Sequence, residues 1–248
     1  MPTVIGGVTW ASKKWGNQVG GILASLPWSA APIMLFFTLE QGVDFTVHSI
    51  KGVMIGIIGV LLFTLTYMYS AIKFRWYVSI LLAYLAFLLV SVTFNAFESL
   101  MNLNAWYILA IVLSLLGLKV FPKIKPQDSH GVSLKYDLYL RMIIVTLFVV
   151  LLTFLAKYIG PTWSGILTPF PIVTAILAAF THYTQGVYGT STILKGMLIG
   201  YVGFATFLFL QAIFLPHYSI FVSFFIGFIV NILLNLLMRF LVKRFASA

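Results

Sequence analysis

The sequence predicts an all-α membrane protein, a polytopic bundle of about eight transmembrane helices arranged as two inverted-topology repeats of about four helices each. Of its 248 residues, 61% are apolar and 8% are charged, and the mean hydropathy is +1.06. Soluble domains have roughly 45–50% apolar and about 25% charged residues. A second observation is the number of segments that reach the length of about 20 apolar residues needed to cross a bilayer. The third is a segment near the N-terminus that recurs in the second half.

Each expected span is an apolar run bounded by polar or charged residues. The first 20 residues are too short and too interrupted to span, so we expect them to lie at the interface or to form a partial helix. The polar loop 122–136 divides the chain into a first half, 1–125, and a second half, 126–248. The expected spans are 22–39, 50–70, 76–95, 103–121, 138–158, 162–183, 193–215 and 218–240.

The basic residues predict the orientation. Cytoplasmic loops are enriched in Lys and Arg, so we expect both termini in the cytoplasm and the protein in the plasma membrane, the inner membrane of a bacterium. The net charge of +10 then reflects topology rather than nucleic-acid binding. The opposite side receives Lys51, Lys157, Glu40, Asp44 and Glu98. The cytoplasmic side receives Lys13, Lys14, Lys73, Arg75, Lys119, Lys123, Lys125, Lys135, Lys243 and Arg244.

An internal duplication is the strongest signal in the sequence. Residues 20–65 match residues 164–209 without a gap at an offset of 144, with 16 of 46 positions identical. The identical residues include five glycines, a proline, a glutamine and a lysine, which chance similarity between apolar helices does not produce. Five expected spans separate the starts of the two copies, so the copies cross the membrane in opposite directions. Such inverted repeats are the recurrent architecture of secondary transporters.

Prolines lie well inside the first expected span of each copy. Proline lacks an N–H donor and clashes with the preceding turn, so it breaks or kinks a helix. Broken helices at matching positions of inverted halves indicate a binding site near the bilayer midplane, although such kinks can also only shape packing. The expected substrate-binding residues at the breaks are Ser25, Pro27, Trp28, Ser29, Thr168, Pro169, Phe170, Pro171 and Thr174, and Pro32 adds a further kink.

Two further conserved pairs between the copies have both structural and functional interpretations. Gln41 and Gln185 precede glycines, and each can cap a helix end or bind a ligand. Lys51 and Lys195 can extend to the interface or attract an anionic substrate. We include all four among the expected substrate-binding residues. The glycine stripes that follow the lysines predict close helix packing, and they comprise Gly52, Gly56, Gly59, Gly196, Gly200 and Gly203.

The remaining polar residues offer little chemistry. Glu40, Glu98 and His182 are the candidates for proton coupling near membrane depth. Asn231 and Asn235 are expected to hydrogen-bond across helices. We find no catalytic or metal-binding motif, so we expect neither an enzyme nor a cofactor or metal.

The second half resembles the GlpM-like family of small bacterial inner-membrane proteins. The resemblance rests on Gly165-Ile-Leu-Thr-Pro-Phe-Pro and Thr181-His-Tyr-Thr-Gln-Gly186, and it covers about a tenth of the chain. Members of that family pair a Phe-Pro after the first span with a later His-Tyr and Gly. The resemblance implies that a half-sized unit can exist alone as a dimer.

The sequence therefore predicts a secondary transporter that works by alternating access on a small anionic or zwitterionic organic solute. A flippase or scramblase for a lipid or lipid-linked amphiphile is the alternative, because it needs the same symmetry with a groove open to lipid. An accessory membrane subunit without a site of its own is the third. The expected partners are the lipid bilayer, the substrate and a second copy in a homodimer, with no nucleic acid.

Overall fold

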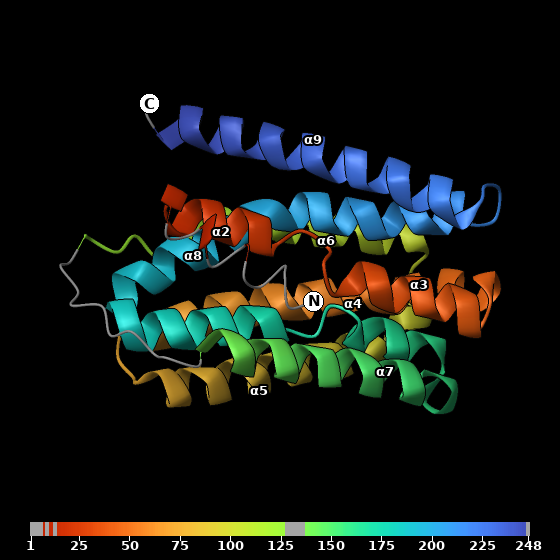
Figure 1. The fold of residues 1–248 in the computed structure, drawn as a ribbon, viewed down its shortest axis with the longest axis horizontal. Coiled ribbons are helices and arrows are strands. Elements are labelled where there is room, and N and C mark those ends of the chain that lie inside the picture. The colour runs from red at the N-terminus through yellow and green to blue at the C-terminus, as the bar shows by residue number, and fades with distance from the viewer. Residues whose placement is uncertain (1–6, 8–9, 12–13, 127–136, 247–248) are drawn as a thin grey trace.

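The structure, a computed structural model, describes residues 7, 10–11, 14–126 and 137–246, and that part of the chain contains helices and no strand. Figure 1 shows the long helices lying roughly along one direction. The described elements are α2 (Asn17–Ala24), α3 (Ala30–Glu40), α4 (Val43–Ala71), α5 (Trp76–Asn95), the 3-10 helix η1 (Glu98–Leu100), α6 (Leu103–Val120), α7 (Asp137–Leu167), α8 (Ile172–Phe214) and α9 (Ile220–Ala246).

Five of the described helices are long and apolar enough to cross a membrane, which is the expected length of about 20 residues or more. The chain is therefore a helical membrane protein. The expected spans 76–95 and 103–121 coincide with α5 and α6 to within one residue. The five helices are Val43–Ala71, Trp76–Asn95, Leu103–Val120, Ile172–Phe214 and Ile220–Val242.

The two proline-containing segments are both interrupted. The segment 22–39 is divided between α2 and α3, and the segment 162–183 is divided between the end of α7 and the start of α8. Pro27, Pro169 and Pro171 lie in these interruptions. Pro32 does not kink α3, contrary to expectation, because it is the third residue of that helix. The N–H groups of the first turn have no partner within a helix, so proline costs little there.

The two interruptions have matching backbone hydrogen bonds at positions 144 apart. In each interruption, three backbone hydrogen bonds connect the end of one helix to the start of the next. The bonds are Leu26 N to Leu23 O (3.2 Å) and Phe170 N to Leu167 O (3.0 Å), Trp28 N to Leu26 O (2.7 Å) and Ile172 N to Phe170 O (2.7 Å), and Ala31 N to Pro27 O (2.8 Å) and Ala175 N to Pro171 O (2.9 Å).

Four glycines mark the ends of these interrupted segments. Gly16 and Gly42 have φ/ψ of 90°/157° and 91°/168°. Gly160 and Gly186, which are 144 positions further on, have 75°/171° and 71°/−168°. This region of φ/ψ space is accessible essentially to glycine alone. Gly160 bends α7 and Gly186 bends α8, so each of these two long elements comprises two helical arms.

The arms run in opposite directions in the two halves of the chain. Figure 1 shows α3 running left to right, whereas residues 172–185 of α8 run right to left. The helix after the bend reverses again in each case, so α4 and residues 187–214 of α8 are also antiparallel. The span expected at 193–215 begins earlier than predicted, directly after Gly186.

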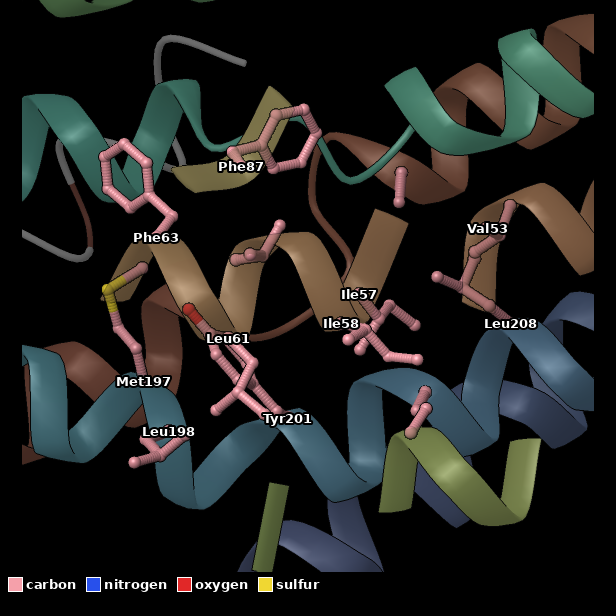
Figure 2. Close-up of a cluster of buried hydrophobic side chains, with 14 of the residues drawn as sticks. Val53, Ile57, Ile58, Leu61, Phe63, Phe87, Met197, Leu198, Tyr201 and Leu208 are labelled. Carbon is pink, nitrogen blue, oxygen red and sulfur yellow. The ribbon is translucent and has the colours of Figure 1, made fainter. Parts of the chain in front are cut away.

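The helices α4 and α8 form the centre of the bundle. Their most apolar windows are 78% and 67% buried, whereas those of α5, α6 and α9 are 22% buried. Figure 2 shows the contact between them, with Ile57, Ile58 and Leu61 of α4 opposite Leu198 and Tyr201 of α8. The outer helices expose leucine, phenylalanine and valine side chains. Such apolar outer surfaces are what a lipid bilayer requires of the helices that contact it.

Charged residues gather differently at the two ends of the bundle. The turn between α4 and α5 carries Lys73 and Arg75, and the end of α6 carries Lys119. The opposite end carries Glu40 at the end of α3 and Glu98 in η1. Lys13, Lys135 and the part of the loop 122–136 that follows residue 126 lie outside the described residues, as does the side chain of Lys243.

Candidate functional site

The first interruption places its polar groups on its own backbone. Ser25 is the C-cap of α2, and its hydroxyl donates to Ile22 O at 2.6 Å. The indole Nε1–H of Trp28 donates to Leu23 O at 2.8 Å. These bonds satisfy carbonyls that the broken helix leaves free, which is a requirement inside a membrane. Ser29 is the half-buried N-cap of α3 and makes no side-chain cap bond.

The second interruption is filled by aromatic side chains. Phe170 stacks on Tyr84 of α5 with 5.3 Å between ring centroids and meets Phe87 edge-on at 5.1 Å. The hydroxyl of Thr168 donates to Ser164 O at 2.8 Å. Aromatic pairs in these two geometries stabilise a fold by more than the burial of their surface area alone does. Phe170 therefore closes this interruption with packed rings, whereas the matching position 26 of the first interruption is a leucine.

A chain of hydroxyl groups lies beside the second interruption. Thr174, in the first turn of α8, hydrogen-bonds Tyr201 on the second arm of the same helix. The Tyr201 hydroxyl also meets Thr64 Oγ1 of α4 at 2.8 Å. These three side chains are buried, and Tyr201 hydrogen-bonds both threonines, so the chain ties α4 to both arms of α8.

The glycine stripes pack as expected, but each stripe contacts a segment of the other half. The stripe of α4 contacts the last turns of α7, and the stripe of α8 contacts α2. A Cβ at Gly21 of α2 would collide with Ile193 O of α8, and a Cβ at Gly165 of α7 would collide with Ser49 O of α4. Position 193 lies 144 residues after position 49. Glycines let two helix backbones approach this closely. The same reciprocal contacts occur for Gly52 with Thr162 O and for Gly196 with Gln18 O.

The two lysines differ in their partners. Lys51 Nζ lies 3.4 Å from Glu98 Oε1, with 34% and 25% of the two side chains exposed. Lys195 is half-buried, and no carboxylate of the described residues forms an ion pair with it. The sequence did not predict the contact between Lys51 and Glu98, because 47 residues and a helix–turn–helix path separate them. Glu98 is therefore paired with a cation from α4.

The two glutamines also differ. Gln41 is the C-cap of α3, and its backbone N–H donates to Phe37 O at 2.9 Å. The side chain of Gln185 accepts a hydrogen bond of 2.5 Å from Asn17 Nδ2, which joins the end of one arm of α8 to the start of α2. In both cases a glycine at positive φ follows directly.

The candidates for proton coupling lie apart from one another. Glu40 is exposed at the end of α3. His182 lies in the first arm of α8, with its Nδ1 3.3 Å from the hydroxyl of Tyr67 of α4. The structure brings His182 together with Tyr67 but with neither glutamate. Among the described residues, no group of three histidines or carboxylates is arranged to hold a metal ion.

Two apolar hollows lie beside the interrupted helices. The larger, about 300 Å³, is a groove between α3 and α9. The smaller, about 210 Å³, lies between α5 and the first arm of α8 and is lined by Trp76, Ala179, Phe180 and Tyr183. Small-molecule sites occupy roughly 300–1,000 Å³. The described residues lining the larger groove are Pro27, Trp28, Ala31, Pro32, Leu35, Phe224 and Phe228.

The sequence did not predict that α9 lines the groove beside the first interruption. Phe224, Phe228, Asn231 and Asn235 recur at intervals of four, three and four residues, which places them on one face of a helix. That periodicity is visible in the sequence, but it does not say which helix the face contacts. The two asparagines do not hydrogen-bond across helices as expected. Instead, Asn235 Nδ2 donates to Asn231 O at 2.9 Å and lies 3.1 Å from Asn231 Oδ1.

Comparison with known proteins finds no relative, because no family model, no curated protein and no solved structure matches the chain.

Proposed function

We propose that the protein is a secondary membrane transporter that works by alternating access between two inverted repeats. The observation that carries the proposal is the pair of interrupted helices at positions 144 apart, with the same backbone hydrogen bonds and the same flanking glycine conformations. Inverted repeats with broken helices near the membrane midplane are typical of secondary transporters.

The reciprocal packing supports the mechanism. The α2 arm contacts the glycine stripe of α8, and the last turns of α7 contact the glycine stripe of α4. Each half therefore packs against the short helical segment that precedes the interruption of the other half. If one half shifts relative to the other, the two interruptions change their surroundings in opposite senses, which opens one face of the membrane as it closes the other. The opposite directions of α3 and the first arm of α8 agree with such an exchange.

The substrate that we propose first is a small anionic or zwitterionic organic solute. Lys195 supports this class, because it is a half-buried cation without a carboxylate partner among the described residues. A cation in such a position attracts an anion more strongly than a fully solvated cation does. Lys51 gives less support than the sequence suggested, since Glu98 already compensates its charge.

A second candidate function is flipping of a lipid or a lipid-linked amphiphile. The specific observation is the groove between α3 and α9, which is open at the surface and whose described lining is mostly apolar. A groove of this kind admits an acyl or isoprenoid chain, whereas it gives a hydrated ion no partner. The third expectation, an accessory subunit without a site, gives no reason for the two interruptions to share one geometry.

Single cysteines test alternating access, because the natural chain contains none. The variants are Ser29→Cys and Val173→Cys, two half-buried positions 144 apart at the starts of the helices that follow the interruptions. A membrane-impermeant maleimide is added to reconstituted vesicles from one side, with and without a panel of organic anions and zwitterions. We expect a transported solute to raise labelling at one position and to lower it at the other.

The control is Ser99→Cys, because Ser99 is an exposed residue of η1. Its labelling should not change with solute. Labelling at positions 29 and 173 that stays constant with every solute, or that rises and falls together, would contradict alternating access.

A further inference from the structure

Two amide side chains of α9 are buried without complete hydrogen bonding. Asn231 is 0% exposed and Asn235 is 4% exposed. After the bonds within α9, Nδ2 of Asn231 and Oδ1 of Asn235 have no partner among the described residues. Leaving a buried donor or acceptor unpaired destabilises a fold, so such atoms in a native protein require an explanation. One is a donor and the other is an acceptor.

The two amides lie against the glycine stripe of α8, next to the first interruption. A Cβ at Gly203 would be 2.7 Å from Asn235 Nδ2, and a Cβ at Gly200 would be 2.8 Å from Asn235 Oδ1. The same Cβ at Gly200 would collide with Oγ of Ser25. The amide pair and the polar end of the first interruption therefore meet at one glycine.

The matching location in the other half is mainly apolar. A Cβ at Gly56 would be 2.6 Å from Cγ of Pro169, and a Cβ at Gly59 would be 2.8 Å from Phe87. The serine and the first asparagine thus have proline and phenylalanine at the corresponding positions. Helix packing alone does not need two amides, since the same glycine stripe on α4 packs against Phe87 and the smaller hydroxyl of Ser91, whose Oγ would be 3.0 Å from a Cβ at Gly59.

The amide pair lies beside one end of the apolar groove, although neither asparagine is among the described residues that line it. On α9, Asn231 follows the groove residue Phe228 by three positions, which is one turn of the same helix face. On the opposite wall, Ser25 precedes the groove residue Pro27 by two positions. Both walls therefore change from apolar to polar toward the same end. None of the described residues that line the groove is charged.

We propose that this groove binds a single-chain membrane amphiphile whose uncharged head group both donates and accepts hydrogen bonds. The chain lies between α3 and α9, and the head accepts from Nδ2 of Asn231 and donates to Oδ1 of Asn235. A charged head is excluded, because burying an ion without a counter-charge costs far more than a hydrogen bond returns. Arg239, the next charged residue on α9, is exposed one turn beyond Asn235. This inference deepens the second candidate function and rests on it.

Monoolein, an oleoyl chain with a glycerol head, is the probe. Thermal unfolding of the detergent-solubilised full chain is measured with monoolein, with methyl oleate, which has no donor, and with oleate, which is charged. We expect monoolein to raise the Tm saturably and the other two to bind at least tenfold more weakly. A monoacylglycerol brominated on the chain should quench the fluorescence of Trp28, and Trp28→Phe should lose that part of the quenching.

The double variant Asn231→Leu, Asn235→Leu tests the head-group site. Because it removes two unpaired polar atoms, its Tm without ligand should not fall, and its affinity for monoolein should fall at least tenfold. Asn235→Ser, which introduces the residue found at position 91, gives the same test if the double variant does not fold. Ser91→Ala is the matched control, since Ser91 Oγ is also buried and unpaired, and it should keep the wild-type affinity.

Equal affinity of the wild type and the asparagine variants for monoolein would overturn the inference. Tighter binding of oleate than of monoolein would also overturn it, and would indicate that Arg239 holds an anionic head. Failure of the proposed function is seen separately. Monoolein binding with constant maleimide labelling at positions 29 and 173 would leave the site standing and reject alternating access, whereas changing labelling without monoolein binding would reject the site alone.

Discussion

At the scale of single residues, the pair formed by Lys51 and Glu98 decides how the duplicated lysines are interpreted. Both side chains are partly exposed, and pairs of that kind contribute about 0–1 kcal/mol to stability. The pair therefore has little effect on folding. If the proposed function holds, the pair changes the charge that a solute meets, because Lys51 has a carboxylate partner and Lys195 has none among the described residues.

Exchanging the two charges separates the roles of this pair. In Lys51→Glu, Glu98→Lys the pair is kept and its direction is reversed, so we expect stability and solute flux close to those of the wild type. Lys195→Gln should reduce the flux of an anionic solute in proteoliposomes by tenfold or more, and Lys195→Arg should reduce it less. Equal loss in both Lys195 variants would indicate packing instead of charge attraction.

At the scale of elements, two pairs of helices meet through direct contact of their backbones. Gly21 and Gly165 lie where α2 meets α8 and where α7 meets α4. In each case the obstacle to a side chain is a carbonyl group of the neighbouring helix, which cannot move without moving the helix. The packing of the two halves therefore tolerates no side chain at either glycine.

Alanine at these two glycines is predicted to destabilise the protein to a similar extent. Overpacking of this kind costs about 1–3 kcal/mol, so Gly21→Ala and Gly165→Ala should each lower the Tm in detergent. Gly117→Ala is the control, since its Cβ would meet side chains and no backbone: the end of Leu61 at 2.7 Å, which can rotate away, and Leu198 at an ordinary contact distance of 3.6 Å. A loss at Gly117 as large as at the other two would contradict the reciprocal packing.

At the scale of the whole molecule, the central helices are buried by protein and the outer helices face the exterior. Apolar residues occur on every side of α5, α6 and α9, because lipid can replace protein as their neighbour. The turns and helix ends at one end of the bundle carry Lys73, Arg75 and Lys119, followed by Lys123 and Lys125. The positive-inside rule then makes that end cytoplasmic, and this remains a prediction.

Two single cysteines test the orientation. Phe74→Cys lies in the turn between α4 and α5, where Phe74 is 48% exposed, and Ser99→Cys lies at the other end of α5. In intact cells an impermeant maleimide should label position 99 and should label position 74 only after the membrane is permeabilised. The reverse pattern would show that the termini face outward.

Much of this architecture follows from the sequence alone, because its causes are local. Composition determines that the chain is a helical membrane protein. The missing N–H of Pro27, Pro169 and Pro171 determines where two helices are interrupted, and the glycine stripes determine which faces can approach closely. The error at Pro32 is also local, since one proline tolerated in a first turn resembles one that breaks a helix until the helix start is known.

What the tertiary structure decided are the contacts between residues distant in sequence. Three features depend on which helices become neighbours. They are the ion pair of Lys51 with Glu98, the packing of α2 on α8 and of the end of α7 on α4, and the groove that α9 forms with α3. In a chain whose helices are apolar on all sides, hydrophobicity does not select those neighbours. The neighbouring helices are selected by the fit between glycines, where one helix has no side chain, and carbonyl groups of the other helix. That fit exists only once the helices are packed.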